Sequence, residues 1–401
     1  MAYFHNRTVN LVNLHYVIGA IAMGGGGAFF SVYVLKAGVG VPAALLAFAA
    51  MFALRLVLRT MLLPFGIRFG LRRLLIMGTL LMGVSFPFLA GVHGLGWGLV
   101  ALVFVSALAD TIYWPSYHAY FAAVGDAEHR GQQLGVREAL TAALGIVTPL
   151  FFGWLLVVFG PRVAFFATGA VQALSAIPIL FTPDVPIAPR APGAYRAALS
   201  GAMLFVGDGF VAAGYFIVWQ MALFVALGES YLAYGGALAV AALVGAVGGL
   251  VLGRWIDAGK GGRAVWYSIG LLVAVIAMRA SVLHSPALAV VANALGALVG
   301  CLYIPTMMTA VYNQAKRSPC VLRFHIAAEG GWDVGVSIAL TMAAAITGCG
   351  YSIGWAILLS LLGAGFVFTL LRRYYAAHPS ETVDAHEPAE FQTQPAEAPR
   401  M

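Results

Sequence analysis

Two carboxylates stand inside long apolar stretches of the sequence. Asp110 lies in SALADTIYWPSYHAYF, and Asp208 lies in LFVGDGFVAAGYFIVWQ between Gly207 and Gly209. A charged side chain at the centre of a bilayer costs about 2.5–3.5 kcal/mol or more, and such residues usually mark proton relays, ion pathways or substrate contacts. If these stretches cross a membrane, Asp110 and Asp208 are the first candidates for carrying a proton or contacting a solute.

Aromatic side chains follow both carboxylates at helical spacing. After Asp110 they stand at i+3, i+4, i+7 and i+11: Tyr113, Trp114, Tyr117 and Phe121. After Asp208 they stand at i+7 and i+11: Tyr215 and Trp219. Residues with this spacing share one face of a helix. Aromatic faces suit an organic, partly apolar solute, so Trp114, Tyr117 and Trp219 are candidate contacts, although such a stripe is also typical of a packing seam.

Arg55 is a candidate of the opposite charge. It stands about 16 Å from the nearer end of its apolar stretch at 1.5 Å per helical residue, which is too deep for easy escape to water. Arg59, one helical turn further, is expected to extend to the interface. Arg55 therefore needs a carboxylate, a water-filled cavity or an anionic substrate, and both Asp110 and Glu138 are candidate partners.

Further charged residues stand where later apolar stretches begin. LGVREAL contains Arg137 and Glu138, and HIAAEGGWDVG contains Glu329 and Asp333. Acidic groups in such places suit the positive N-terminus of a helix. Because the two sets have similar places in the two parts of the chain, we expect them to form interhelical ion pairs or gates rather than substrate contacts.

The composition is that of a membrane protein. Of the 401 residues, 62% are hydrophobic and 9% are charged, whereas soluble domains carry about 25% charged residues. The formal net charge of +7 is assigned to loops that set the membrane topology, so no nucleic-acid partner is expected. The three cysteines are scattered without metal or disulfide spacing, and we expect no cofactor and no metal.

Twelve stretches are long enough to cross a bilayer, which takes about 20 residues each. They are predicted at 12–35, 41–66, 72–92, 97–122, 132–158, 162–182, 199–226, 231–253, 264–283, 287–313, 326–347 and 350–371. Lysines and arginines concentrate in one set of alternate loops, whereas the opposite loops contain only Lys36 and Arg162, with Arg279 near the end of a span. This asymmetry predicts that both termini are cytoplasmic.

The predicted spans divide six and six. A proline-rich polar segment, 183–198, separates an N-terminal bundle (1–182) from a C-terminal bundle (199–375), and it is expected to be a cytoplasmic linker. Residues 376–401 contain acids and prolines without apolar periodicity, so a disordered tail is expected.

The two bundles share a weak repeat. Tyr113-Trp-Pro115 recurs 190 residues later as Tyr303-Ile-Pro305. Asp110 does not recur, because Gly300 takes its place. A scaffold role would more naturally appear in both halves, so the asymmetry favours a role for Asp110 in handling a substrate or a proton.

The loops after the second and eighth predicted spans carry a motif. The second copy keeps Gly253-x-x-x-Asp257 with basic residues after it, and the first copy, PFGIRFGLRR, has Ile67 where an Asp is expected. Together with twelve spans and a parallel six-span repeat, these loops resemble those of the major facilitator superfamily of transporters.

The resemblance implies an all-α fold of two six-helix bundles in which spans one, four, seven and ten line a central cavity. It implies that the Asp110 stripe faces this cavity and that Asp257 helps to latch one state. We therefore expect a monomeric secondary transporter of the bacterial inner membrane that moves a small organic solute by alternating access, coupled to protons or another ion. Gly145-x-x-x-Pro149-x-x-x-Gly153 faintly echoes a motif of antiporters and slightly favours export.

Other functions stay open. A uniporter, a lipid flippase, or a non-transporting sensor or assembly protein could use the same fold. An enzyme is not expected, because the sequence has no His-Glu-x-x-His, no Gly-x-Ser-x-Gly and no Walker Gly-x-x-x-x-Gly-Lys-(Ser/Thr) motif.

Overall fold

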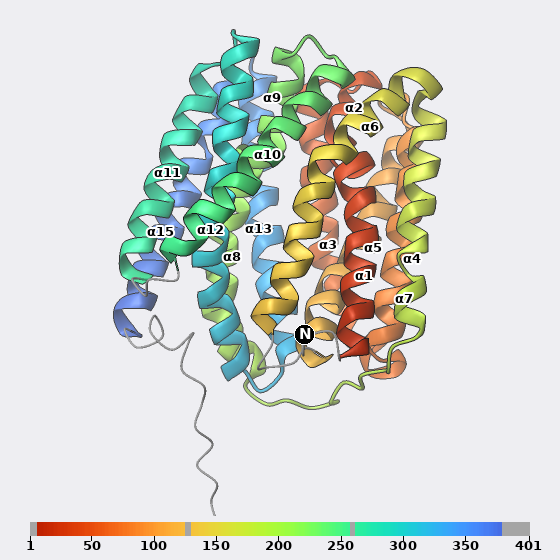
Figure 1. Ribbon diagram of the computed structural model, residues 1–401, viewed down its shortest axis with the longest axis vertical. Coiled ribbons are helices and arrows are strands. Elements are labelled where there is room, and N and C mark those ends of the chain that lie inside the picture. Colours follow the sequence, from red (N-terminus) through yellow and green to blue (C-terminus); the bar gives the residue numbers. More distant parts are fainter. Residues whose placement is uncertain (1–5, 125–129, 257–260, 379–401) are drawn as a thin grey trace, which may run out of the picture.

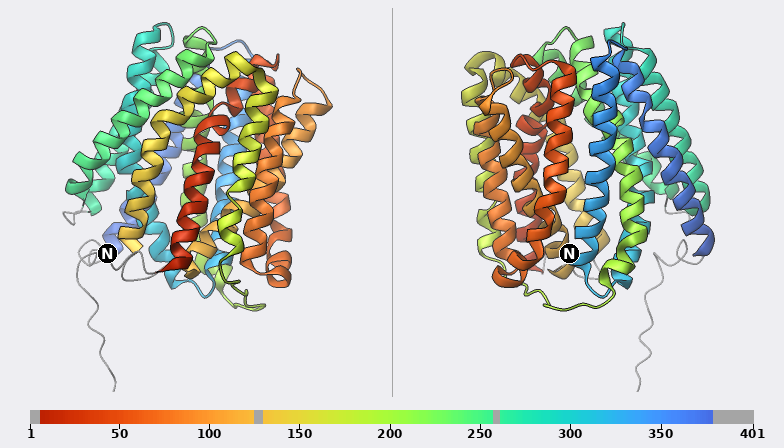
Figure 2. Two further views of the ribbon diagram at one scale, coloured as in Figure 1. Left: turned by 45° about the vertical axis from the view of Figure 1, so that its right-hand side comes forward. Right: turned by 180° about the vertical axis from the view of Figure 1, so that it is seen from behind.

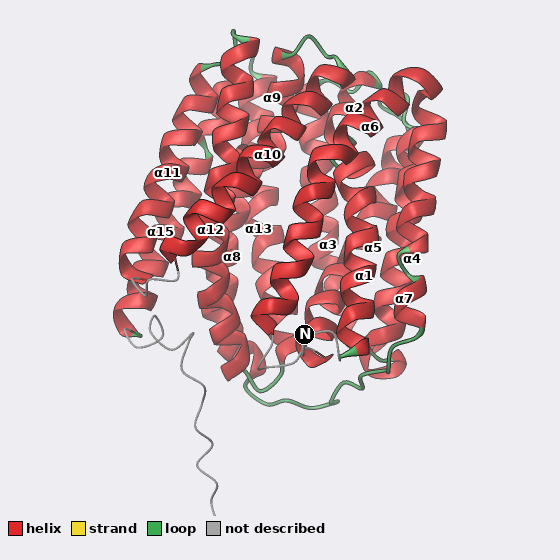
Figure 3. Cartoon of the chain, viewed as in Figure 1, coloured by secondary structure: helices red, strands yellow, loops and turns green. Residues whose placement is uncertain are grey.

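A computed structural model describes residues 6–124, 130–256 and 261–378 of the protein. Within these ranges the side chains of 122, 130–139, 250–256 and 261–262 are not described. The described residues form helices joined by short loops, with no strand among them (Figure 3). The predicted all-helical class is confirmed, since in a bilayer a helix satisfies its own backbone hydrogen bonds.

The helices before residue 183 pack on one side of the molecule (Figure 1). They are α1 (Arg7–Ala22), the π-helical segment η2 (Met23–Gly27), α2 (Phe30–Lys36), α3 (Val41–Phe69), α4 (Leu71–Ala90), α5 (Trp97–Val124), α6 (Arg130–Leu174) and α7 (Ile177–Leu180).

The helices after residue 193 pack on the other side. They are α8 (Ala194–Ala212), the π-helical segment η3 (Ala213–Val218), α9 (Trp219–Ala226), α10 (Tyr231–Ile256), α11 (Gly261–Ser281), α12 (Pro286–Arg317), α13 (Val321–Gly348), α14 (Ile353–Leu358) and α15 (Ser360–Ala377).

Eleven helical stretches of the described residues are long and apolar enough to cross a membrane. One of them, Leu140–Leu180, has 41 residues, about twice the length that a bilayer needs. It contains Gly160 with φ +78° and ψ 171°, a non-helical conformation inside α6. Figure 1 shows that α6 rises to the top of the molecule, turns there and descends.

The two sides meet mainly along two helix pairs, α3 with α13 and α6 with α10, and also where α5 meets α13 and α2 meets α9. Figure 2 shows α3 and α13 side by side from behind, and Figure 1 shows the connection between α7 and α8 running across the bottom. We call this end of the molecule, which also holds the start of α1 and the end of α15, the inner end, and the opposite end the outer end.

Glycines bring α8 and α13 into close backbone contact. A Cβ on Gly331 or Gly335 of α13 would overlap the carbonyl oxygen of Ala202 or Val206 of α8. A Cβ on Gly209 of α8 would in turn overlap a carbonyl of α13. Small residues allow membrane helices to approach in this way, and the approach fixes where the polar side chains of both helices lie.

Candidate functional site: a central ion network

Five charged side chains from three helices meet between the two sides of the molecule, and we call them the central ion network: Arg55 and Arg59 of α3, Asp110 of α5, and Glu329 and Asp333 of α13. Arg55 lies 3.3 Å from Asp110 (Nη1 to Oδ2), 3.7 Å from Glu329 (Nη2 to Oε2) and 3.1 Å from Asp333 (Nε to Oδ1). Arg59 donates from Nε to Asp333 Oδ2 at 2.5 Å, and its Nη2 lies 3.5 Å from Glu329. The network therefore joins α3 and α5 to α13.

The network carries an excess of one formal negative charge, since two guanidinium groups face three carboxylates. Four of its side chains are 12% exposed or less, whereas Asp110 is 23% exposed. Buried charges are tolerated only when they are well paired. Asp110 is therefore the most exposed side chain of the network.

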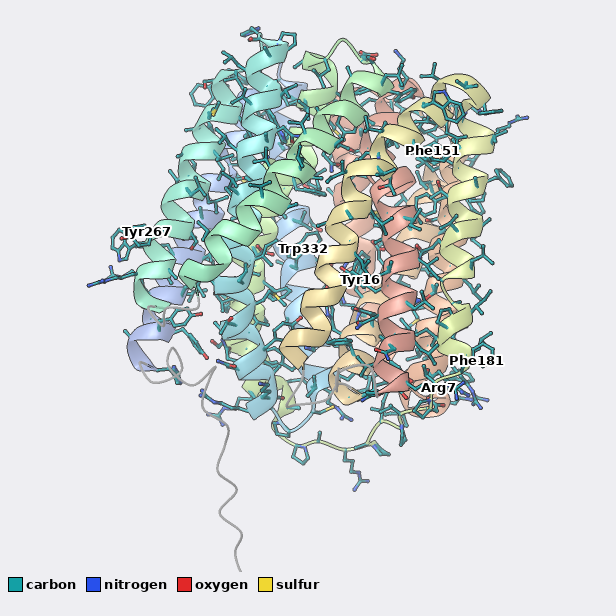
Figure 4. All side chains as sticks on the ribbon, viewed as in Figure 1. Arg7, Tyr16, Phe151, Phe181, Tyr267 and Trp332 are labelled. Carbon is teal, nitrogen blue, oxygen red and sulfur yellow. The ribbon has the colours of Figure 1, made fainter. Side chains whose placement is uncertain are left out.

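Asp208 lies on α8 next to this network. Tyr303 of α12 donates its hydroxyl to Asp208 Oδ1 at 2.8 Å, and the Trp332 side chain also hydrogen-bonds to Asp208. The Trp332 ring lies 5.6 Å from the Arg55 guanidinium carbon and packs edge-on against Phe52. Figure 4 shows Trp332 in the interior, on α13. Trp332 thus connects Asp208 to the arginine at the centre of the network.

The aromatic stripe after Asp110 divides into two parts. Tyr113 and Tyr117 are buried and pack against α1, where the Tyr117 ring stacks on Tyr16 at 5.2 Å. His15 Nδ1 donates to a backbone carbonyl at 2.7 Å, so its Nε2 accepts the Tyr113 hydroxyl at 3.1 Å. Trp114, by contrast, is half-buried. Tyr117 therefore lies in a packing seam, while Trp114 shares partial exposure with Asp110.

The stripe after Asp208 faces α12. Tyr215 donates its hydroxyl to the carbonyl of Gly296 at 2.7 Å, and Trp219 donates from Nε1 to Asn293 at 3.0 Å. Trp219 is 2% exposed. Asn293 precedes Tyr303 on α12 by about 15 Å of helix, so the structure places Trp219 in a buried seam towards the outer end, away from the ion network.

The remaining predicted residues fall into two groups. Glu329 and Asp333 form ion pairs between the two sides of the molecule. The side chains of Arg137 and Glu138 and the whole of Asp257 lie outside the described residues, so the suggested pairing of Arg55 with Glu138 stays a hypothesis.

Arg59 was expected to reach the membrane interface, and that expectation is wrong: the side chain is 3% exposed and paired with Asp333. Two carboxylates of α13, Glu329 and Asp333, pair with its guanidinium group inside the molecule. One signal in the sequence matches this arrangement, because Arg55/Arg59 and Glu329/Asp333 have the same i, i+4 spacing, which places each pair on one face of its helix.

The linker between the two bundles, 183–198, supplies a carboxylate to the junction of α3 and α4. This junction holds the first copy of the loop motif, in which Ile67 replaces the expected Asp. Asp184 Oδ1 accepts a hydrogen bond from the backbone N–H of Arg72 at 3.1 Å, at the start of α4. Gly70, with φ +80°, has no room for a Cβ beside this carboxylate. Arg72 also donates from Nη1 to the carbonyl of Thr182 at 2.8 Å. Asp184 therefore caps α4 and holds the linker against the loop.

The sequence matches the family described as Major Facilitator Superfamily over residues 13–319. The chain belongs to this superfamily. Its fold is similar to that of a POT family transporter crystallised with 5-aminolevulinic acid (TM-score 0.69, 11% identity, 93% of this chain and 97% of that chain). It is also similar to the human organic anion transporter MFSD10 (TETRAN), with a TM-score of 0.62, 14% identity and coverage of 90% of this chain and 99% of that chain.

No curated protein matched the sequence in the comparison. The family and the fold together support a multi-pass membrane protein of the secondary-transporter type, which agrees with the resemblance found in the motif loops. The central ion network is the polar site that this member of the superfamily builds between its two sides.

Proposed function

We propose that the protein is a proton-coupled transporter that moves a small organic solute by alternating access between two six-helix halves. The observation that carries the proposal is the central ion network, which joins the two sides and holds one carboxylate more than it has guanidinium groups. One proton balances this charge, so binding and release of a proton change the contacts between the halves.

Asp110 is the proposed proton carrier. Its partner Arg55 is shared between Asp110, within the same half, and Glu329 and Asp333 of the other half. A proton on Asp110 removes the competing partner, so Arg55 is held more strongly by α13. Loss of that proton draws Arg55 back towards α5 and weakens the contact of α3 with α13. The protonation state of Asp110 thus biases which arrangement of the halves is stable.

The proposed solute site includes the partly exposed groups beside the network, Asp110, Trp114, Asp208 and Trp332. This set combines carboxylates with aromatic faces, which suits a small organic molecule with both polar and apolar parts. The two structural neighbours, one crystallised with 5-aminolevulinic acid and one named an organic anion transporter, also support a small organic solute. The glycine and proline pattern of α6 slightly favours export.

We propose twelve spans with both termini in the cytoplasm. Leu140–Leu180 then provides two spans, divided at Gly160, and the inner end faces the cytoplasm. This assignment agrees with the excess of lysine and arginine in the inner loops. We propose a monomer in the bacterial inner membrane.

Proteoliposomes that contain a trapped pH-sensitive dye test the coupling. A panel of small organic acids, amines and peptides, including 5-aminolevulinic acid, is first screened by thermal shift, because a ligand that binds the folded state raises its stability. Each hit is then added to vesicles with an imposed pH gradient. We expect proton flux with the wild type and loss of this flux with Asp110→Asn. Thr111→Val, which changes the next residue of α5, is the matched control and should keep the flux. Proton coupling through Asp110 is refuted if uptake of a hit is independent of the pH gradient in both the wild type and Asp110→Asn.

A further inference from the structure

Two π-helical segments occupy equivalent places in the two halves. η2 begins at Met23 and η3 at Ala213, 190 residues apart, which is the offset that relates Tyr113 to Tyr303. A π-helical turn contains an extra residue and leaves the regular hydrogen-bond ladder, and such turns are frequent at functional sites. Each segment is followed along the chain by a helix at the outer end, α2 in one half and α9 in the other.

These outer helices and their neighbours close the outer end of the molecule. Ser31 of α2 donates to Gln220 of α9 at 3.1 Å, and Lys36 lies 3.2 Å from Glu229 in the loop that follows α9. At the start of α2, the Phe29 ring packs edge-on against Tyr234 of α10 at 5.2 Å. Opening this end therefore requires α2 and α9 to separate.

The first π-helical segment is built for backbone freedom. It contains four consecutive glycines, Gly24–Gly27, and Gly25 has a non-helical ψ of −105°. A cavity of about 80 Å³ lies beside it, lined by residues that include Gly25, Thr148 and Phe152. The glycines widen the range of backbone conformations open to this turn, while a Cβ on Gly24 or Gly26 would overlap Thr148 or Thr168 of α6.

The second π-helical segment is held by a charged side chain. In an α-helix the N–H of Trp219 would donate to the carbonyl of Tyr215, but here it donates to Gly214 and Phe216. Arg279 of α11 donates from Nη1 to the Tyr215 carbonyl at 2.5 Å. The guanidinium group thus satisfies the carbonyl that the π-helical turn leaves without its α-helical partner.

Arg279 fits closely around this turn. It is 4% exposed, and its guanidinium carbon lies 4.1 Å from the Tyr215 ring centre and 4.8 Å from that of Trp219. A Cβ on Gly296 of α12 would overlap the Arg279 Nη2. At the equivalent place in the first half, 190 residues earlier, stands Leu89. The contact of an arginine with the π-helical turn is therefore specific to the second half.

We propose that Arg279 is a positioning residue that holds η3 in its π-helical form and so keeps α9 against α2 in the closed outer gate. The inference rests on the alternating access of the proposed function. When Arg279 leaves the Tyr215 carbonyl, the turn can return to the α-helical ladder. Because an α-helix has 3.6 residues per turn, taking up the extra residue rotates the helix beyond it by about 100°. That rotation moves Gln220 away from Ser31 and shifts the loop that bears Glu229.

A distance measurement between spin labels at the outer end tests this role without any substrate. One label is placed at Leu95→Cys, which is 73% exposed between α4 and α5, and the other at the native exposed Cys349 after α13. Cys301 and Cys320 are replaced by alanine. In Arg279→Leu, which introduces the residue type found in the first half, we expect the ratio of open to closed distances to rise about tenfold or more, in line with loss of a hydrogen bond from a charged group.

Two further variants separate positioning from folding. Gly296→Ala keeps the arginine but displaces its guanidinium group, and it should reproduce the shift; Arg279→Lys, which keeps one charged donor, should restore part of the closed population. Tyr215→Phe keeps the acceptor carbonyl and the ring and should leave the distances of the wild type. If folded Gly296→Ala gives the wild-type distances that are expected of Tyr215→Phe, the proposed role of Arg279 is wrong, even where proton-coupled transport is intact. A failure of transport coupling with these distance shifts present would instead count against the proposed function.

Discussion

The excess of carboxylates in the central ion network predicts unequal effects for two substitutions that break the same number of ion pairs. Arg59→Met removes the pairs with Glu329 and Asp333, and Asp333→Asn removes the pairs with Arg55 and Arg59. Arg59→Met leaves three carboxylates around one guanidinium group, whereas Asp333→Asn leaves two of each sign. The residual charge therefore differs by two between the variants.

The magnitudes follow from this difference. Removing one partner of a buried pair costs about 3–5 kcal/mol, and we expect Arg59→Met to lie at the upper end of that range. Two unit charges 4 Å apart interact with about 4 kcal/mol at an effective dielectric constant of 20, and repulsion among the three remaining carboxylates adds to the cost of the lost pairs. Asp333→Asn avoids the repulsion and should be less destabilising.

The pH dependence distinguishes the two variants by sign. In Arg59→Met the crowded carboxylates of the folded protein take up a proton more readily than those of the unfolded chain. The folded state then binds more protons than the unfolded state, so its stability falls as pH rises and recovers as pH falls. Asp333→Asn leaves as many carboxylates as guanidinium groups in the network, so its stability should show no such recovery at low pH.

Thermal unfolding of the purified protein between about pH 5 and pH 8 checks this prediction. Lys36→Ala provides the control, because its partner Glu229 is half exposed and an exposed pair contributes only about 0–1 kcal/mol. If Arg59→Met and Asp333→Asn lose equal stability and respond alike to pH, the formal charge of the network does not govern its energetics and the reasoning is refuted.

Three more predictions concern the supports of the site. Asp184→Ala should lower the free energy of unfolding by about 0.5–2 kcal/mol through loss of the α4 cap, whereas Asp184→Asn should keep most of it; equal losses in denaturant titrations would contradict the capping role. Gly335→Ala should destabilise by about 1–3 kcal/mol, because its Cβ would overlap α8, while Gly365→Ala, with open space around it, should be tolerated; thermal shift compares the two. Tyr303→Phe should cost about 1–3 kcal/mol because Asp208 loses a hydrogen bond, and wild-type stability in thermal unfolding would argue that this bond is weak.

Much of the architecture could be predicted from the order of residues alone. Long apolar stretches must form helices in a bilayer, because only intrahelical hydrogen bonds satisfy their backbone there, and this holds wherever the helices end up. The cost of a buried charge likewise marked Asp110 and Arg55 as residues that need partners.

The choice of partners was decided by the tertiary structure. Arg59 pairs with Asp333, 274 residues away, because glycines such as Gly331 let α13 approach α8 and so set the face that α13 turns to α3. Asp184 reaches α4 through a linker whose path no local pattern determines.

The π-helical turn at η3 is the clearest case of a feature that the sequence did not reveal. The spacing of Asp208 and Trp219 predicts a regular helix face, and both side chains do face α12. The extra residue between them becomes stable where Arg279, from another helix, donates to the carbonyl that the turn leaves free. Helix formation is local and can be inferred from a stretch of sequence, whereas a departure from the helix needs a partner from outside it, and only the assembled fold supplies that partner.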